Sequence, residues 1–249
     1  ASDVYKRQVE KLGIGFVRPL GKCSLDEAMF RLDFLHGLED YGIPIINPPS
    51  SIEIALNKFR TLHVLARNGI PVPETFVTEN PRAAMNYVDK LKNKLVLKPL
   101  FGSRGLGSML IEKPDEAWRI LGELQFIHKV AYMQPFIEHG GRDLRLFVID
   151  GEVVASMIRR QVKRGEWKTN IARGAIPEPF KPSGELRELA VRSAEIIGCR
   201  IAGVDIVEHG GEYRVLEVNS QPGWKGIQSV SRVNIAGKIV EYLVKEAKK

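Results

Sequence analysis

Cysteine is scarce in this chain of 249 residues: Cys23 and Cys199 stand far apart and form no CxxC spacing. The sequence therefore predicts neither a disulfide framework nor a zinc site, and a reduced cytoplasm is the expected setting. Long apolar runs are also absent, because no stretch approaches the roughly 18 to 20 residues that a membrane helix needs. No charged-then-apolar leader opens the chain. We expect a soluble protein with no membrane partner.

Histidine pairs at metal-binding spacing are missing too. The chain has no HxH or HxxxH pattern, no nucleophile elbow and no Cys–His pair. Zinc ligation and triad-type nucleophilic catalysis therefore have little support. The five histidines are His36, His63, His128, His139 and His209.

Basic residues exceed acidic ones by 37 to 30, which gives a formal net charge of +7 at pH 7. Part of the excess is local, since residues 142–173 hold eight Lys or Arg against four Asp or Glu. Such a stretch is typical of a solvated basic face, a groove for phosphates and carboxylates, or a nucleic-acid surface. Aromatic side chains are few there, which disfavours a nucleic-acid partner.

The first part of the chain carries two helix-start signals. Ser24 with Glu27 forms a capping box, and so does Ser50 with Glu53. The second box opens helical sequence that runs on to Gly69, where glycine before an Ile-Pro pair is a normal stop. Strand-like sequence precedes the first box, so the opening residues predict a strand followed by helices.

The remainder mixes short strands with helices, which predicts an α+β fold in two lobes. We expect a segment preceding the lobes at 1–49, a central lobe at 50–130 and a C-terminal lobe at 131–249. Two hairpins dominate the C-terminal lobe, with turns at Asp-Gly and His-Gly-Gly. The expected strands lie at 74–78, 95–100, 108–112, 144–150, 152–160, 202–208 and 212–220, and further helices start near 81, 115, 185 and 235.

A glycine-rich loop, Gly102-Ser103-Arg104-Gly105-Leu106-Gly107, joins two of these strands. Because it connects strand to strand, it fits neither a dinucleotide fingerprint nor a P-loop, both of which lead into a helix. Small residues in such a hairpin let backbone N–H groups approach a polyphosphate closely. The functional prediction is a flap over phosphates, and the alternative is an ordinary glycine hairpin tip.

Lys98 lies inside an apolar run, Leu95-Val96-Leu97-Lys98-Pro99-Leu100. A charge in such a strand is costly to bury unless it has an anionic partner, and a phosphate oxygen would serve. The alternative is an edge strand whose lysine reaches solvent.

Asp205 is expected on one strand of the last hairpin, with Glu217 and Asn219 on its partner. Residues two apart share a strand face, and a three-residue loop at 210–212 would set Asp205 directly opposite Glu217. Oxygen ligands of this kind suit Mg²⁺, which takes one or two carboxylates and completes its octahedron with phosphates and water. Acids on the solvent face of a sheet are the alternative.

Taken in order, several segments resemble those of an ATP-grasp ligase, most closely the RimK-type branch of α-L-glutamate ligases. The likeness runs from about Phe16 to the C-terminus. It implies an ATP-grasp fold, in which two lobes with antiparallel sheets clamp ATP, preceded by the remnant of an N-terminal α/β subdomain. The segments are Ala55 to Arg60, Gly69-Ile70-Pro71-Val72-Pro73, Lys98 with the glycine loop, Gln134-Pro135-Phe136-Ile137, Gly141 to Arg145, Asn170 to Gly174, Ala202 to Ile206, and Glu217 to Gly223.

The resemblance implies ATP as a cofactor, with two ions of magnesium or manganese. In the family, lysines hold the phosphates, the glycine loop is the lid and the hinge segment reads adenine. The residues expected to bind ATP are Lys58, Lys98, Gly102, Ser103, Arg104, Gly105, Gly107, Gln134, Pro135, Phe136, Ile137, Asp143, Lys168, Thr169 and Asn170. The residues matching the metal ligands are Asp205, Glu217 and Asn219.

Family chemistry transfers the γ-phosphoryl group of ATP to a carboxylate, and an amine attacks the acyl phosphate to give an amide, ADP and phosphate. Such transfer requires positioning and charge neutralisation rather than a protein nucleophile. We assign Arg159 and Arg173 to gripping the acceptor carboxylate and the acyl phosphate, because a planar guanidinium holds such groups bidentately. The implied substrates are a small-molecule carboxylate and an amino acid, with glutamate favoured. Family members are often dimers or tetramers, so a homo-oligomer is left open.

Two departures from the family bear on the substrate. Only the last strand, helix and strand of the N-terminal subdomain are expected, at 16–47, so the chain resembles a fragment. The motif from Asn170 to Ala175 lacks the histidine and second glycine of the bacterial ribosomal-protein-modifying enzymes. Pro222 to Gln228 looks more like archaeal ligases that glutamylate a pterin or deazaflavin coenzyme.

Three other interpretations stay open. The chain could be a different ATP-grasp amino-acid ligase, acting on a carrier protein or a peptide. It could be a non-catalytic nucleic-acid-binding module, as the net charge alone would suggest. It could also be a nucleotide-binding relic that binds ATP without turnover.

Overall fold

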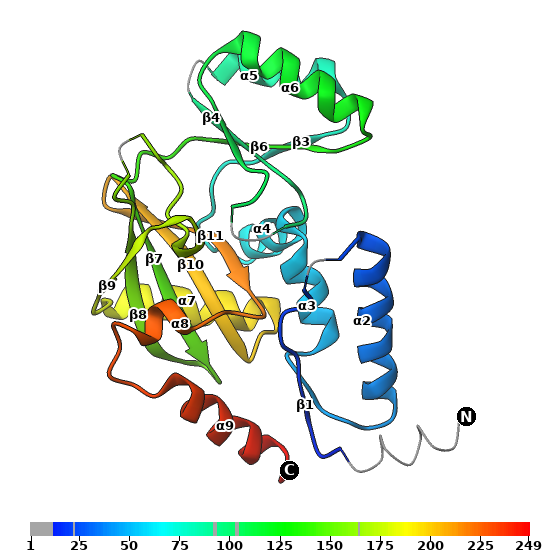
Figure 1. The fold of residues 1–249 in the computed structure, drawn as a ribbon, viewed down its shortest axis with the longest axis vertical. Helices are drawn as coiled ribbons and strands as arrows, with labels where there is room; N and C mark the ends of the chain where they lie inside the picture. Colours follow the sequence, from blue (N-terminus) through cyan, green and yellow to red (C-terminus); the bar gives the residue numbers. More distant parts are fainter. Residues whose placement is uncertain (1–11, 22, 92–93, 103–104, 164) are drawn as a thin grey trace.

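The computed structural model describes residues 12–21, 23–91, 94–102, 105–163 and 165–249. A four-stranded sheet lies at the top of the molecule in Figure 1, with a five-stranded sheet below it. A third unit, a helix with a two-stranded parallel sheet, lies beside the larger sheet. The expected α+β class is confirmed. No helix in these residues is both long enough and apolar enough to cross a membrane.

The five-stranded sheet is antiparallel, with strand order β11-β10-β7-β8-β9. Both predicted hairpins are present, β7 with β8 and β10 with β11. At the first turn Asp150 and Gly151 both have positive φ, as a two-residue hairpin turn of type I′ requires. The strands are β7 (Arg142–Ile149), β8 (Glu152–Arg160), β9 (Ile176–Pro179), β10 (Ile201–His209) and β11 (Glu212–Asn219).

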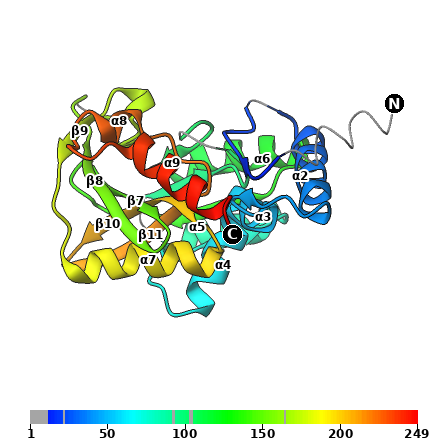
Figure 2. The same cartoon turned by 90° about the horizontal axis from the view of Figure 1, so that it is seen from below.

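Alternation along the strands gives this sheet two different faces. Leu146 and Val148 belong to one face and share a buried cluster with residues of α7. Phe147 and Ile149 belong to the other and share a cluster with residues of α8 and α9. Figure 2 shows α7 and α9 on opposite sides of the sheet. These helices are α7 (Gly184–Ile197), α8 (Lys225–Gln228) and α9 (Ile235–Glu246).

The four-stranded sheet has the order β3-β6-β4-β5 and is covered on one face by α5 and α6 (Figure 1). Its last strand in sequence, β6, lies beyond residue 130, so the change from one sheet to the other falls after Pro135. The division of domains at residue 130 stays a prediction. The elements are β3 (Phe76–Thr78), α5 (Pro81–Leu91), β4 (Leu95–Lys98), β5 (Met109–Ile111), α6 (Pro114–Phe126) and β6 (Ala131–Pro135).

The N-terminal unit contains the capping box of Ser24 and Glu27, which is confirmed in both directions. The second predicted box is wrong: the helix starts at Pro49, whose ring presets the backbone, and Ser50 makes no capping bond. Helical sequence is also interrupted at Asn57, whose side chain accepts the N–H of Arg60 and starts a new helix. The elements are β1 (Gly15–Phe16), α2 (Leu25–Asp40), β2 (Ile45–Ile46), α3 (Pro49–Leu56) and α4 (Lys58–Arg67).

Asn47 ties this unit to the five-stranded sheet. Its amide nitrogen donates to the carbonyls of Ile201 at 2.7 Å and Ser220 at 2.5 Å. Its oxygen accepts the backbone N–H groups of Arg200 at 2.7 Å and Ile201 at 2.8 Å. The side chain is 1% exposed, and these four bonds use its two donors and both acceptor positions. The unit is thereby fixed to the start of β10 and the end of β11.

Candidate active site

A buried charged cluster lies on the five-stranded sheet, on the face that packs against α8 and α9 further along the strands. The register sets Asp143 opposite Arg159, and Arg145 opposite Asp205. Opposite residues on neighbouring strands share one face, so the four side chains converge. Asp143 is 5% exposed, and Arg159 and Asp205 are each 4% exposed.

The cluster is joined by charge-assisted hydrogen bonds. Arg145 donates from Nε and Nη2 to the two carboxylate oxygens of Asp205, at 2.5 and 2.6 Å. Arg159 binds Asp143 in the same two-pronged way at 2.7 and 2.5 Å, and its Nη2 lies 3.0 Å from Oδ2 of Asp205. The hydroxyl of Thr169 donates to Asp143 at 2.7 Å. Two arginines and two aspartates therefore neutralise one another in a fixed geometry.

Burial would by itself favour the neutral forms of these groups, but their partners outweigh it. Burial raises the pKa of Asp205, whereas Arg145 and Arg159 together hold it below the usual range. Burial lowers the pKa of Arg159, but the two aspartates raise it by more. Both side chains are therefore charged at neutral pH. Removal of one partner from such a buried pair costs about 3–5 kcal/mol, because the other charge is left uncompensated.

The predicted pairing of Asp205 with Glu217 is confirmed, and Asn219 lies opposite Gly203. The amide nitrogen of Asn219 donates to the carbonyl of Gly203 at 3.1 Å. This bond leaves the Asn219 oxygen without a donor among the described residues, as a cation ligand would require. Two carboxylates and an amide oxygen thus stand on one face of the hairpin.

The turn and the register that produce this pairing differ from the prediction. His209 pairs with Glu212 across a two-residue turn, so the predicted three-residue loop is wrong. A β-bulge between Asp205 and Ile206 restores the register, because Leu216 is an extra residue on β11. The bulge therefore brings Glu217 opposite Asp205.

The donor set fits a hard cation in its chemistry. Asp205 receives two hydrogen bonds from Arg145 and an ion-pair contact from Arg159, and it keeps acceptor capacity, since a carboxylate offers about four lone-pair positions. Among the described residues there is no cluster of three or more His, Cys, Asp or Glu placed to hold a metal. A set completed by Asn219 and by phosphate oxygens suits Mg²⁺ or Mn²⁺ better than zinc.

Lys98 projects from the end of β4 and donates to Oε1 of Gln134 at 2.6 Å. The amide nitrogen of Gln134 donates to the hydroxyls of Thr75 at 2.9 Å and Tyr132 at 3.1 Å, which turns its oxygen toward Lys98. Burial lowers the pKa of Lys98 to about 8, with nearby Glu217 opposing this shift and a further lysine adding to it. Lys98 therefore brings a cation of the small sheet close to a carboxylate of the large one.

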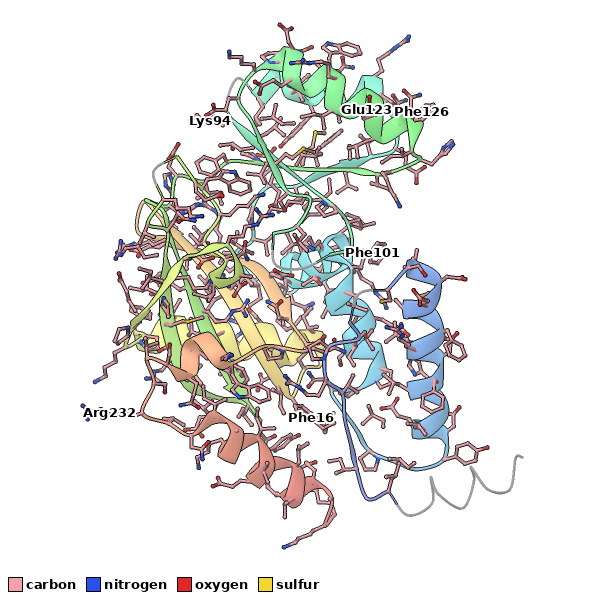
Figure 3. All side chains as sticks on the ribbon, in the orientation of Figure 1. Phe16, Lys94, Phe101, Glu123, Phe126 and Arg232 are labelled. Atoms are coloured by element: carbon pink, nitrogen blue, oxygen red, sulfur yellow. The ribbon has the colours of Figure 1, made fainter. Side chains whose placement is uncertain are left out.

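That further lysine is Lys58, the first residue of α4. Its ammonium donates to the carbonyl of Gly102 at 2.5 Å, and its backbone N–H donates to the carbonyl of Leu100 at 3.2 Å. Asn57 and Phe101 form an isolated β-bridge beside it. Phe101 accordingly lies where the small sheet meets α4 (Figure 3). The start of the glycine loop is thus held against the helix that carries Lys58.

The described part of the glycine loop reaches the larger lobe, whereas Ser103 and Arg104 lie outside the described residues. Gly105 has a φ of +65°, and a Cβ there would stand 2.4 Å from Oδ1 of Asn170. Arg173 donates to the carbonyl of Gly105 at 3.3 Å. The loop therefore meets Asn170 and Arg173 of the larger lobe, and Lys98 lies near Glu217 of the same lobe, as a nucleotide clamp requires.

The segment that follows β8 supplies Lys168, Thr169, Asn170 and Arg173, the last of these in a 3₁₀ turn, Ile171–Arg173. Burial and the neighbouring Arg173 lower the pKa of Lys168. The Nε of Arg173 is buried without a hydrogen-bond partner in the described residues. An anion between the lobes would satisfy both groups.

The hinge segment, residues 134–137, begins with the last two residues of β6 and runs beyond the strand. The N–H of Phe136 donates to the carbonyl of Lys94 at 2.8 Å. The ring of Phe136 meets Trp167 edge-to-face, with centroids 6.1 Å apart, and His139 at 5.6 Å. Pro135 and Ile137 flank that ring in sequence, and Gln134 is turned toward Lys98, so these four predicted residues lie together but present different groups.

Comparison with known proteins identifies the family of this chain. A model of the RimK-like ATP-grasp domain matches residues 55–243. The tetrahydromethanopterin:alpha-L-glutamate ligase of Methanocaldococcus jannaschii is 40% identical over 252 aligned positions, which cover 98% of this chain and 83% of that relative. The chain belongs to the RimK-like ATP-grasp family.

Two further matches agree with that assignment. A probable alpha-L-glutamate ligase of Legionella pneumophila is 37% identical to this RimK-like chain, over 86% of the chain and 71% of the relative. The ATP-grasp ligase PsnB, solved with a minimal precursor, shares the fold with a TM-score of 0.69 at 23% identity, covering 89% of this chain and 70% of PsnB. The ATP-grasp fold and the class of carboxylate–amine ligase are confirmed.

Sequence reasoning missed several residues of this RimK-like site. Arg145 was noted only within a segment that resembles the family. Its position two residues after Asp143 on a predicted strand would have placed both side chains on one face. Thr75 and Tyr132, which orient Gln134, carry no signal of their own. The contact of Trp167 with the hinge depends on a long connection between strands, whose path the sequence does not specify.

Proposed function

We propose that this RimK-like protein adds L-glutamate to the carboxylate of a coenzyme of the tetrahydromethanopterin type, using ATP and Mg²⁺ or Mn²⁺. The relative that carries this activity in its name is 40% identical over 98% of the chain. The structural observation that carries the proposal is that Lys98 of the smaller sheet lies near both Lys58 of α4 and Glu217 of the larger sheet. A lysine of the smaller sheet, a lysine at the start of α4 and oxygen ligands of the larger sheet are what a metal–triphosphate complex between two sheets needs.

In this proposal Lys58 and Lys98 bind phosphate oxygens, and the glycine loop covers them. Asp205, Glu217 and Asn219 would hold the ions, which supply charge neutralisation at the phosphates when bound. Gln134 to Ile137 line the adenine side, with Trp167 behind Phe136. Asp143, Thr169 and Asn170 complete the nucleotide side. Phosphate oxygens in this position would displace the weak neutral partners of both lysines.

The two predicted arginines receive different roles. Arg173 has an unpartnered Nε and lies beside the glycine loop, which supports contact with the transferred phosphoryl group and the acyl phosphate. Arg159 is bound on two of its nitrogens by Asp143 and Asp205. We therefore propose that Arg159 acts on the acceptor by positioning Asp205, and that Arg173 touches the reacting group.

The proposed reaction has two steps. A carboxylate oxygen of the acceptor attacks the γ-phosphorus of ATP, and ADP leaves. The amine of glutamate then attacks the acyl carbon, phosphate leaves, and the amine loses a proton as the amide forms. Neither step requires a covalent bond to the protein, which agrees with a site built of cations, carboxylates and backbone N–H groups.

Mass spectrometry tests the proposal directly. The protein is incubated with Mg–ATP, glutamate and a panel of pterin, deazaflavin, peptide and carrier-protein acceptors, with Glu217→Ala as the control. A glutamyl mass increment together with ADP, absent in the control, supports the proposal and names the acceptor. Formation of AMP would contradict the acyl-phosphate route. Binding of ATP without turnover on any acceptor would favour a nucleotide-binding relic.

A further inference from the structure

A loop of the N-terminal unit, residues 17–21, lies beside the segment that follows the β10–β11 hairpin, which carries Asp205, Glu217 and Asn219 and is called the metal hairpin below. The N–H of Leu20 donates to Oε1 of Gln221 at 3.2 Å, and the carbonyl of Leu20 accepts a hydrogen bond from Arg31. Phe16 lies where this unit meets the larger sheet and packs into the cluster under α8 and α9 (Figure 3). The backbone N–H and the carbonyl of Leu20 are therefore both hydrogen-bonded, which fixes the path of the loop.

Arg18 stands on this fixed loop and is stacked on an aromatic ring. Its guanidinium carbon lies 4.2 Å from the ring centroid of Trp224 and 5.6 Å from that of Phe16. Trp224 is itself held edge-to-face against Phe147, with centroids 6.4 Å apart. Stacking holds the plane of the guanidinium and leaves its N–H edge available for a bidentate anion.

Arg18 makes no ion pair within the described residues, in contrast to Arg31, Arg145, Arg159 and Arg160. The sequence around it explains this, because 12–25 and 218–240 contain no Asp or Glu. Both segments carry basic residues instead. An exposed guanidinium that is oriented by stacking and has no ion-pair partner among the described residues is a preformed anion site.

A strip of the chain, residues 219–224, leads from the charged cluster to Trp224, on which Arg18 is stacked. Pro222 lies against Gly203, where a Cβ would come within 3.0 Å of the Pro222 Cβ, and the side chain of Arg145 lies beside the same glycine. Asn219, which faces Gly203, is three residues before Pro222. A molecule whose carboxylate reacts near Asn219 can therefore extend along this strip toward Trp224.

We infer that Arg18, stacked on Trp224, binds a second anionic group of the acceptor while its first carboxylate reacts at the metal hairpin. This inference rests on the proposed function, and it makes the acceptor a molecule with at least two anionic groups. Arg18 is thus a specificity-determining residue for the acceptor and not for ATP or glutamate.

Equilibrium binding of a minimal diacid tests the inference without any turnover. N-acetyl-L-glutamate is titrated calorimetrically into the protein in the presence of Mg–ADP, and N-acetyl-L-glutamine serves as the ligand that lacks one charge. We expect the unmodified protein to bind the diacid about tenfold more tightly, as loss of a bidentate charged contact implies. Arg18→Ala should abolish this difference, and Arg18→Lys should restore only part of it.

Arg119→Ala is the matched control, since Arg119 is an exposed arginine of α6 on the far lobe. Trp224→Leu keeps the charge but removes the stack, so it should weaken the preference for the diacid. Equal affinity of wild type and Arg18→Ala for the diacid would overturn the inference, and so would failure of the wild type to bind it. A fall in melting temperature without a change in diacid preference would show that Arg18 is only a structural contact. Failure of the proposed function would appear separately, as absence of ADP release in the acceptor screen.

Discussion

The two sheets differ in how completely their charged residues at the site are paired. On the larger sheet Asp143, Arg145, Arg159 and Asp205 are paired with one another at 2.5–3.0 Å and are neutral as a group. On the smaller lobe the ammonium of Lys98 has a neutral amide oxygen as its hydrogen-bond partner. One surface is complete before any ligand arrives, whereas the other has a cation without a full counter-charge.

This difference indicates which residues hold the site's side chains in place and which residues bind the ligand. Fixed, mutually satisfied charges hold Asp205 in place at little cost when the ligand binds, as preorganised sites do. Lys98, whose pKa burial lowers to about 8, carries a charge near neutral pH that an incoming anion would stabilise. Changes on the larger sheet should therefore reduce turnover or stability, and changes on the smaller lobe should weaken nucleotide binding.

Loss of Glu217 is expected to have the largest effect. Glu217→Ala removes a carboxylate that stands opposite Asp205 and that we propose as a metal ligand, and the charge stabilisation of a metal at a phosphoryl group is worth several kcal/mol. Turnover, measured as ADP release, should fall by about a thousandfold or more. Glu212→Ala, at the exposed end of the same strand, is the control. Retention of a tenth of the activity in Glu217→Ala would remove Glu217 from the metal site.

The neighbours Arg159 and Arg160 separate a buried ion pair from an exposed one. Arg159→Ala leaves Asp143 and part of Asp205 buried without their counter-charge, and should cost about 3–5 kcal/mol of unfolding free energy. Arg160 binds Glu178 with equally good geometry, at 2.7 and 3.0 Å, but in solvent. Arg160→Ala should therefore have little measurable effect. Urea denaturation of both variants checks this, and similar losses would contradict the contrast.

Removal of the Lys98 charge tests the smaller lobe. Lys98→Met should raise the dissociation constant for Mg–ATP by about ten- to a hundredfold, as expected for a lost charged hydrogen bond. The pKa of about 8 also predicts a pH effect. Below pH 8 the free protein already carries the charge, so ATP affinity should be flat. Above it a proton must be taken up on binding, and affinity should fall by up to tenfold per pH unit.

Nucleotide titrations between pH 7 and 9.5 measure this dependence. The profile of Lys98→Met should be flat over the same range. A wild-type profile that is also flat would show that Lys98 keeps its proton in the free protein.

Gly105→Ala should give the smallest of these effects. Alanine at a φ of +65° costs about 1–2 kcal/mol, and its Cβ would meet Asn170. We expect the KM for ATP to rise a few-fold to tenfold with little change in melting temperature. Gly122 in α6 has no atom within 4 Å of an added Cβ, so Gly122→Ala should leave ATP kinetics unchanged. Equal kinetics in the two variants would show that the glycine loop does not depend on its contact with Asn170.

Local signals predicted most of the fold. The Asp-Gly turn, the Ser24 capping box and the alternation along the two hairpins specify elements that form from neighbouring residues. The second helix prediction was wrong at two points. The helix starts at Pro49 without a capping box at Ser50, and Asn57 ends it by capping a new helix. The bulge at Leu216 was equally hidden, since a register depends on both the turn and the strands.

The candidate site was predictable where residue type and spacing suffice. The hairpin places Asp205 and Glu217 on neighbouring strands, although their direct pairing depends on the bulge. Lys98 follows from a charge in an apolar strand. The pairing of Arg159 with Asp143 and Asp205 depends on the order of β7, β8 and β10 in the sheet, which joins strands distant in sequence. Arg18 on Trp224 depends on the packing of one unit against another, and the sequence contains no local signal for it.

The four hydrogen bonds of Asn47 also determine where this protein can be shortened. A fragment cut to the matched family range, 55–243, would lack Asn47. The N–H groups of Arg200 and Ile201 and the carbonyl of Ser220 would then lose their partner beside the hairpin that carries Asp205. A minimal expressed fragment should therefore begin upstream of β2, and the sequence boundary of the family is not the boundary of the cooperative folding unit.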